Sequence, residues 1–241
     1  MSVAKKIEKK INQIKEGTIF RYQQLSIDPE EYVAATKAIE RLIAKGMIKR
    51  ISAGVFYKQK QSIFGELKPK EEELLKPYLF KNGKRVAYIT GLSLYNRMGL
   101  TTQVPRTIRI ASRDKRIRVS VGNIKGKAVK SYIDVTDKYY YLLEILDALK
   151  DFNKITDIDK KSAIKILSNK IKKLNESEIK QLVKYSLSYP PRTRAFLGAI
   201  LDQINSLVDL TSLKKSLNPL STYKYGINED LLPTSKNWNL A

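Results

Sequence analysis

A single helix with clear start and stop signals is predicted between Asp28 and Gly46. Asp28 can cap the unpaired N–H groups of a first turn, and Pro29 suits the first helical position, where a missing N–H costs nothing. Gly46 can adopt the left-handed conformation that ends a helix. The positions that recur at three- and four-residue spacing and predict a buried face are Ala35, Ala38, Ile39, Leu42 and Ile43. The positions left to face outward are Tyr32, Thr36, Lys37, Glu40 and Arg41.

The segments on either side of this helix predict a small DNA-binding fold. After Gly46 the pattern alternates around the turn residues 52–54, which predicts a β-hairpin over residues 48–58. A helix is expected over residues 3–16, a short strand at 18–20 and a short helix at 22–25. This order is typical of a winged helix-turn-helix, whose second helix enters the DNA major groove while the hairpin lies along the backbone. The alternative is an ordinary helix–hairpin piece of a folded core.

Composition removes several functional classes. The 241 residues contain no histidine and no cysteine, which excludes disulfides, thiol nucleophiles, histidine bases and ordinary zinc sites. Hydrophobic residues make up 42% of the chain, as in a folded protein. No apolar run approaches the ~20 residues of a membrane span, and residues 1–17 lack the apolar centre of a signal peptide. We therefore expect a cytoplasmic protein without membrane partners, cofactors or metal ions.

The positive charge is concentrated in the amino-terminal half. Of a net charge of +22, residues 1–130 contribute +18, from 29 Lys and Arg against 11 Asp and Glu. The remaining residues contribute only +4. Concentrated positive charge attracts a polyanion through counterion release, which predicts a nucleic-acid partner. An anionic membrane surface is the weaker alternative, because no basic amphipathic helix has a large aromatic apolar face.

The rest of the chain predicts an α+β protein with two domains. A connector without periodicity at residues 59–69 suggests a winged helix-turn-helix domain at 1–62 and a second domain at 63–241. The second domain should be mixed α/β to about residue 133 and mainly helical beyond it. Its helices are expected at 71–80, from a Thr90 cap to Met98, 137–150, 159–174, 176–187 with Asn175 as cap, and 190–207. Its strands are expected at 107–111, 116–121 and about 127–133.

A second basic region lies in the middle of the chain. Between Arg97 and Lys130 there are ten basic residues and a single acid, Asp114. On the expected strands, Arg109, Arg116 and Arg118 would present charge along one sheet face, and together with Arg113 they form a candidate basic patch. A second nucleic-acid contact and a solvated basic surface explain this region equally well.

Several segments resemble one bacterial family. They are RISAGVFYK, FGELKPKEEELLK, YITGLSLYNRMGLTTQVPRTIRIAS, LLEILDALK and YPPRTRAFLGAIL, in this order along nearly the whole chain. Together they resemble AbiEi-like antitoxins of abortive-infection toxin–antitoxin systems, most specifically in the block from Tyr88 to Ser112. The resemblance implies an amino-terminal winged helix that binds inverted repeats in its own promoter and represses the operon. It also implies that the remaining chain counteracts a nucleotidyltransferase-type toxin without a stable complex.

The resemblance also implies which residues contact DNA. By position these are Thr36, Lys37 and Arg41 of the second helix and Lys49, Arg50 and Lys58 of the hairpin. One departure is the acidic opening DPEEY of that helix, where winged helices often have Ser or Arg. Glu30 and Glu31 would repel phosphate, so base contacts are expected to begin near Tyr32.

Enzymatic activity is not expected. Histidine and cysteine, the usual catalytic side chains, are absent. Asp157 and Asp159 lie two residues apart, a spacing that directs both carboxylates to one side of an extended segment, as in a metal site. Helix capping explains them more simply. Residues 91–93 lack the second glycine and the histidine partner of a hydrolase nucleophile elbow, and there is no Gly-rich phosphate loop. The alternative to the antitoxin is a winged-helix regulator whose carboxy-terminal domain senses a ligand or dimerises.

Overall fold

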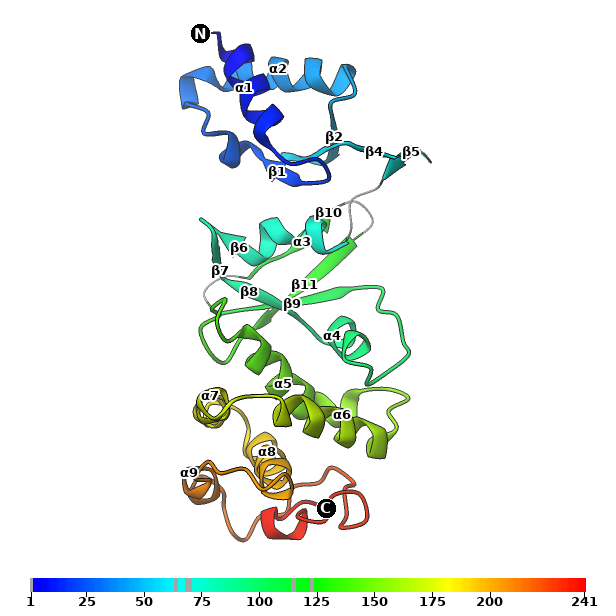
Figure 1. Ribbon diagram of the computed structural model, residues 1–241, viewed down its shortest axis with the longest axis vertical. Coiled ribbons are helices and arrows are strands. Elements are labelled where there is room, and N and C mark those ends of the chain that lie inside the picture. Colours follow the sequence, from blue (N-terminus) through cyan, green and yellow to red (C-terminus); the bar gives the residue numbers. More distant parts are fainter. Residues whose placement is uncertain (1, 63–64, 68–70, 114–115, 122–123) are drawn as a thin grey trace. The chain divides into compact units, whose positions relative to one another are not determined.

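The protein has an α+β fold that divides into two compact units (Figure 1). The computed structural model describes residues 2–62, 65–67, 71–113, 116–121 and 124–241. Unit 1 comprises Met1–Gly83 together with Val119–Lys125, and unit 2 comprises Lys84–Arg118 together with Gly126–Ala241. Within the described ranges, no helix has both the length and the apolar character needed to cross a membrane.

Unit 1 contains a three-stranded antiparallel sheet, with strand order β1-β3-β2, and two packed helices. Its helices and strands are α1 (Val3–Gln13), β1 (Ile19–Arg21), α2 (Tyr32–Ala44), β2 (Ile48–Ser52), β3 (Val55–Lys58), β4 (Lys60–Ser62), β5 (Gly65–Leu67), α3 (Glu71–Leu79), β6 (Phe80–Lys81) and β10 (Val119–Val121), with short 3-10 helices at Tyr22–Leu25 and Pro29–Glu31. One small core joins α1, α2 and the sheet; its central residues are Ile7, Ile11, Phe20, Ile39 and Phe56. The helices at 3–16 and 22–25, the strand at 18–20 and the hairpin at 48–58 were predicted to within a few residues.

The helix predicted between Asp28 and Gly46 is confirmed, but its start differs. Asp28 makes no side-chain capping bond, and a 3-10 turn at Pro29–Glu31 precedes the α-helix, which begins at Tyr32. The expected cap is therefore wrong, because the chain reaches α2 through this tighter turn. At the other end Gly46 has φ of +71°, and its N–H donates to Ile43 O at 2.9 Å. This is the left-handed ending that the sequence predicts.

Unit 1 extends beyond residue 62, where a domain boundary was expected. The guanidinium of Arg21 on β1 lies 4.4 Å from the ring centroid of Tyr78 on α3. The hydroxyl of Tyr57 on β3 donates to the carbonyl of Leu67 on β5. Tyr78 also donates from its hydroxyl to Ser120 O at 3.4 Å, which joins β10 to the same unit. Aromatic side chains therefore join this segment to the first sheet. The loss of periodicity in the connector suggested a domain boundary and did not indicate these contacts.

Unit 2 begins with a small sheet in which β8 (Ala87–Thr90) runs antiparallel to β9 (Ile108–Ser112). Strand β11 (Ile124–Lys130) runs parallel to β9, and β7 (Lys84–Arg85) precedes β8 along the chain. Helix α4 (Leu92–Arg97) lies between β8 and β9 in sequence. Thr90 does not cap α4, as was expected; Gly91 occupies the N-cap position, and the Thr90 hydroxyl donates to Asp147 Oδ2 at 2.7 Å. The strand expected at 116–121 covers only Val119–Val121.

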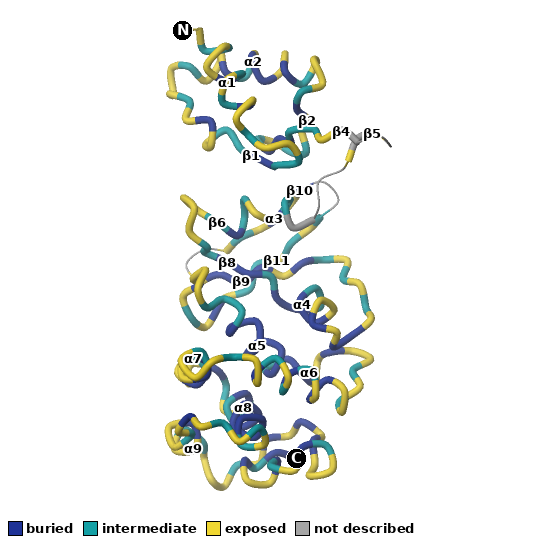
Figure 2. The backbone as a smooth tube through the Cα atoms, in the orientation of Figure 1, coloured by how far each residue is buried: buried dark blue, intermediate teal, exposed yellow. Residues whose placement is uncertain are grey.

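The carboxy-terminal part of unit 2 is helical, as predicted. Its helices are α5 (Tyr140–Asp151), α6 (Lys160–Lys172), α7 (Glu176–Ser186), α8 (Pro191–Gln203) and α9 (Thr211–Lys215), with 3-10 turns at Phe152–Lys154 and Lys236–Trp238. Helices α5 and α8 are buried along most of their length and form the centre of the core (Figure 2). Two predicted caps are confirmed. Asp159 accepts from Ser162 N at 2.7 Å, and Asn175 accepts from Glu178 N at 2.9 Å.

The tail after Asn218 is irregular, as expected, but it completes the core. Tyr223, Tyr225 and Trp238 are all buried. The Trp238 Nε1–H donates to Asp202 Oδ2 at 3.1 Å, and its ring lies directly against Gly198 of α8. A Cβ at position 198 would lie 2.2 Å from a ring atom of Trp238, so only glycine lets the tail pack this closely. The helical glycine is thus explained by the approach of the tail.

We predict that Gly198→Ala destabilises the protein by about 1–3 kcal/mol, because the added methyl group must displace the indole ring. Urea unfolding of the full-length protein measures the change in the free energy of unfolding. The control is Trp238→Leu, in which the smaller side chain leaves room for the methyl group. In that background Gly198→Ala should cost less than in the wild type; an equal cost in both backgrounds would show that the clash is not the cause.

Candidate nucleic-acid interface

The outward face of α2 is the surface that the sequence predicts to contact DNA. The positions facing the core, among them Ala35, Ile39 and Leu42, are buried. On the opposite side Tyr32 and Val33 are 48% and 71% exposed. The other exposed side chains of this face are Lys37, Glu40 and Arg41. Because the apolar positions recur at helical spacing, the burial of one face fixes which residues the other presents.

Lys37 and Arg41 are the two cations of this face. They lie one turn apart on α2, and the side chain of neither makes a hydrogen bond or an ion pair with any residue that the structure describes. Thr36, also predicted to contact DNA, is half-buried, and its hydroxyl donates to the Tyr32 carbonyl at 2.9 Å within the helix. The two cations are therefore available to an external anion, whereas the Thr36 hydroxyl already has a partner.

The acidic start of α2 is partly neutralised. Glu31 accepts from the ammonium of Lys6 on α1 at 2.8 Å, and this hydrogen bond and the carboxylate charge raise the pKa of Lys6. Glu30 is exposed beside it. One of the two carboxylates expected to repel a phosphate is thus paired with a cation of its own unit. The repulsion at the helix start is correspondingly smaller than the sequence alone indicates.

Three aromatic rings fix the start of α2 against the hairpin. Tyr22 meets Tyr32 with ring centroids 5.3 Å apart, and it meets Phe56 edge to face at 5.0 Å. Aromatic pairs at these separations contribute beyond their buried area. The first turn of α2 is thereby held at a set position relative to β3. The sequence pattern indicates no role for Tyr22, because its ring contacts with Tyr32 and Phe56 are tertiary contacts. The one available signal was its position close before the helix in sequence.

The β2–β3 hairpin presents basic residues beside α2. Lys49 and Arg50 are exposed on β2, and the guanidinium of Arg50 lies 5.8 Å from the ring centroid of Phe56. The pairing shifts between Arg50 and Ser52, so a bulge precedes the turn. Lys58 differs from these two, because its ammonium donates to Asn12 O at 2.9 Å and Ile14 O at 2.7 Å at the end of α1. Lys58 therefore holds α1 against the hairpin.

A groove of about 480 Å³ lies beside the tip of this hairpin within unit 1. Tyr22 and Tyr32 form part of its wall, together with Gly54 of the turn and Tyr78 of α3. Arg21 also lines it, and the Arg21 Nε–H is shielded from solvent without a hydrogen-bond partner among the described residues. The groove places an aromatic and cationic surface next to the exposed face of α2. Sequence reasoning missed it, because α3 was assigned to another domain.

The second basic region does not form the single strand face that the sequence suggested. Arg109 lies on β9, exposed and paired in register with Lys127 of β11. Arg113 donates to the carbonyls of Ser131 and Tyr132 at 3.3 and 3.2 Å. Arg116 and Arg118 are exposed but precede β10, so they are not on a strand. The expected alignment of Arg109, Arg116 and Arg118 along one sheet face is therefore wrong.

A cluster of titratable groups around Asp147 in unit 2 is buried rather than open. Asp147 of α5 is 2% exposed and accepts from the hydroxyls of Tyr88 and Thr90 at 2.9 and 2.7 Å. It also accepts from Tyr189 at 3.3 Å and from the ammonium of Lys150 at 2.8 Å. Burial, together with the Asp147 carboxylate, raises the pKa of the Tyr88 hydroxyl far above its usual value, so it stays protonated and donates. The cluster is saturated and has no free ligand position.

Glu144 lies one turn before Asp147 on α5. Unlike Asp147, it pairs with an arginine, Arg97, whose side chain is exposed. Its Oε1 accepts from Arg97 at 2.6 Å, while the carboxylate itself is almost fully buried. Desolvation raises the pKa of Glu144 above its ordinary 4.5, and the Arg97 charge offsets this only in part. The folded state therefore binds a proton at Glu144 more tightly than the unfolded state does.

The raised pKa gives a pH-dependence of stability with a definite sign. In the window just above pH 4.5 the folded state holds more protons at Glu144, so stability rises as pH falls through the folded pKa and then levels off. We predict that the stability of the wild type relative to Glu144→Gln increases from neutral pH down to this window. Urea unfolding at stepped pH measures it. Glu176→Gln is the control, because the hydrogen bond and charge of Lys180 lower the pKa of Glu176 below 4.5. The stability that this exposed carboxylate contributes is lost only below pH 4.5, so the relative stability of this pair should stay flat in the window above it.

Comparison with known proteins gives a family and a fold. A family model described as a family of unknown function, DUF6088, matches residues 6–179. No curated protein matches the sequence. The crystal structure of the RV2827C protein from Mycobacterium tuberculosis is similar, with a TM-score of 0.53 and 9% identity over 90% of this chain and 81% of that chain. At this identity the likeness shows the fold alone. Because the family model spans well over half of the sequence, the protein belongs to the DUF6088 family.

Proposed function

We propose that residues 1–62 form a winged helix-turn-helix that binds double-stranded DNA, and that the protein is the antitoxin and autorepressor of a toxin–antitoxin operon. The observation that carries the DNA-binding part is the outward face of α2. Its two cations, Lys37 and Arg41, have no partner among the described residues, while the opposite face is buried. A helix with one face in a core and a cationic face in solvent has the form of a DNA-reading helix.

The dimensions of α2 suit a major groove. Its 13 residues, Tyr32–Ala44, span about 20 Å at 1.5 Å per residue. The major groove of B-DNA is about 12 Å wide and admits one helix. In this proposal Lys37 and Arg41 reach base edges or phosphates in the groove, and Tyr32 lies at its rim with its ring held by Tyr22. Glu30 remains at the solvent edge of the helix start.

The hairpin supplies contacts to the DNA backbone in this arrangement. Lys49 and Arg50 are exposed on β2, next to α2 in the same unit. Lys58 acts differently from the direct contact that the resemblance implied. Its ammonium is engaged by the carbonyls that end α1, so it positions the hairpin for Lys49 and Arg50. In this proposal Lys37, Arg41, Lys49 and Arg50 contact DNA, whereas Lys58 orients the hairpin.

The antitoxin part of the proposal rests on the resemblance to AbiEi-like antitoxins. Its most specific block, Tyr88 to Ser112, folds as β8, α4 and β9 of unit 2. Tyr88 and Thr90 of this block donate to Asp147 of α5, so the block packs with the helices of unit 2. We propose that unit 2 opposes a nucleotidyltransferase-type toxin, without a stable complex, while α2 represses the promoter. Arg109, Arg113, Arg116 and Arg118 are not needed for the DNA-reading role.

The DNA proposal predicts a residue-specific loss of affinity for the operon's own promoter. Lys37→Ala or Arg41→Ala should weaken binding by about 1–3 kcal/mol if the side chain makes a bidentate base contact. With ~6 phosphate contacts, log affinity should fall with log salt with a slope near −5. Fluorescence anisotropy with labelled promoter duplex measures both quantities.

The matched control for this experiment is Lys184→Ala, which removes the same charge from an exposed position on α7 of unit 2. It should leave promoter affinity nearly unchanged. Equal binding of the wild type to promoter and scrambled duplexes would leave only non-specific attraction and contradict the proposal. Full-affinity binding by Lys37→Ala and Arg41→Ala together would show that α2 is not the reading helix.

The antitoxin proposal predicts rescue of growth. Co-expression with a nucleotidyltransferase-like protein encoded beside it should relieve that protein's toxicity, and Lys37→Ala should rescue equally well because α2 is not part of the neutralising unit. Colony counts on inducing medium measure the rescue. Persistent toxicity at matched expression of both proteins would refute the antitoxin role, whatever the outcome of the DNA-binding experiment.

A further inference from the structure

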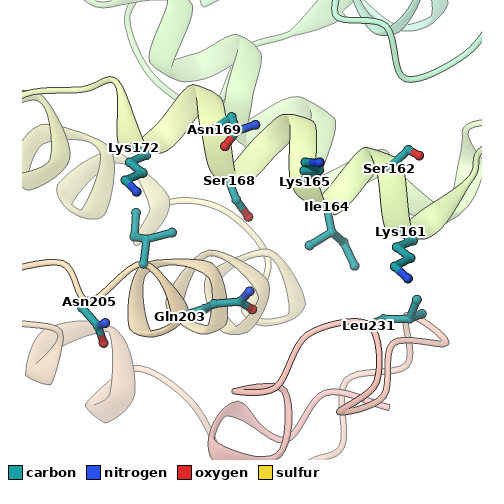
Figure 3. Close-up of a pocket in the computed structure, with 11 residues that line it drawn as sticks. Lys161, Ser162, Ile164, Lys165, Ser168, Asn169, Lys172, Gln203, Asn205 and Leu231 are labelled. Carbon is teal, nitrogen blue, oxygen red and sulfur yellow. The ribbon is translucent and has the colours of Figure 1, made fainter.

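A groove within unit 2 has the chemistry of an anion site. It lies between one face of α6 and the end of α8, with Leu231 of the tail at one side (Figure 3). Its volume is about 580 Å³, within the usual range for small-molecule sites.

The charge of this groove is entirely positive. Three of its lining residues are lysines, and none is acidic. Lys161, Lys165 and Lys172 lie four and seven residues apart on α6, a spacing that places them along one side of the helix. None of the three forms an ion pair or hydrogen bond with a residue that the structure describes, although Lys160 beside them donates to the carbonyls of Tyr225 and Gly226. The ammonium groups of Lys165 and Lys172 therefore line the groove without an ion-pair partner among the described residues, whereas Lys161 interacts electrostatically with the exposed Asp159 carboxylate.

The floor of the groove contains a hydroxyl that lacks a partner. Ser168 Oγ is shielded from solvent and makes no hydrogen bond with any described residue. In Figure 3 its side chain points from α6 toward α8, between the flanking lysines. A buried hydroxyl without a partner is costly, and native structures usually supply one. A ligand oxygen on the floor would provide it, independently of the charge of the lysines.

The remaining walls suit the rest of an organic ligand. Ile164, Ile204 and Leu231 contribute apolar surface. The side-chain amides of Gln203 and Asn205 come from the end of α8 on the opposite side, and each can donate to or accept from hydroxyl and amino groups. A small inorganic anion would use the lysines and leave these walls empty. The combination fits a molecule with a phosphoryl group at one end and a partly apolar, hydrogen-bonding body at the other.

We propose that this groove binds a phosphorylated small molecule of about nucleotide size. The phosphoryl oxygens contact Lys165 and Lys172, with Lys161 at the far end of the row, and the body of the ligand lies against Ile204 and Leu231. This site is additional to the proposed DNA-binding and antitoxin roles and does not depend on either. Its ligand class follows from unpaired lysines, an unsatisfied hydroxyl and the volume, all within unit 2.

Isothermal titration calorimetry of the full-length protein with ATP, pyrophosphate and adenosine tests the proposal. We expect saturable one-to-one binding of ATP, weaker binding of pyrophosphate and no binding of adenosine. Lys165→Gln and Lys172→Gln should each weaken ATP binding about tenfold, since each removes one charge-assisted contact. Ser168→Ala should weaken it less, and the control Lys184→Gln should leave it unchanged. Thermal unfolding of each variant checks that the fold is intact.

Three outcomes would overturn the proposal. The first is no saturation by ATP up to about 5 mM at low salt, where binding would be too weak to matter. The second is pyrophosphate binding as tight as that of ATP, which would leave the apolar and amide walls without a role. The third is a loss of promoter affinity in Lys165→Gln,Lys172→Gln as large as that in Lys37→Ala, which would make the groove part of a DNA surface. If Lys165→Gln,Lys172→Gln binds the promoter normally but no longer binds ATP, the result supports the site. This holds even if the antitoxin role is refuted.

Discussion

The buried carboxylate of Asp147 is the point on which the organisation of unit 2 depends. It accepts hydrogen bonds from Tyr88 and Thr90 of β8, from Tyr189 before α8 and from Lys150 of its own helix. A carboxylate removed from water is tolerated only when donors of this kind surround it. Because the donors come from the sheet and from the helical part, the α/β section and the helices have to fold as one body. Because donors surround it, Asp147 can be buried on a helix whose other buried residues are mainly apolar.

The sequence predicted the elements that local chemistry determines. The stop at Gly46, the caps Asp159 and Asn175 and the turn of the hairpin depend on residues within a few positions of each other, and all are present. The predictions that failed concern polar groups with two possible partners. Thr90 was expected to cap a helix, and its hydroxyl instead donates to Asp147, which lies 57 residues away. Asp28 was expected to cap α2, and a 3-10 turn takes its place. Sequence spacing ranks local partners and contains no information on distant ones.

In the candidate site too, local features were predictable from the sequence and tertiary contacts were not. Helical periodicity alone predicted which face of α2 is buried, and so which residues it exposes. It could not distinguish an exposed cation from one that is used inside the fold. Lys37 remains unpaired among the described residues, whereas Lys58, which looked equivalent in sequence, caps the carbonyls at the end of α1. Tyr22 had no predicted role and proves to hold the first turn of α2 through Tyr32. Roles that depend on tertiary contacts were therefore inaccessible to the pattern.

The distribution of charge needs the structure before it can indicate a binding surface. Counting residues places the excess in the first 130 positions, yet several lysines there, such as Lys10 and Lys58, are occupied by backbone carbonyls. The second part of the chain is nearly balanced in charge, but some of its acids, such as Glu144 and Asp147, are buried, and Asp159 caps α6. The groove beside α6 is lined by Lys161, Lys165 and Lys172 and, among the described residues, by no acid. A nearly neutral segment can thus present a strongly cationic groove, because it is the position of the acids, and not their number, that decides the local potential.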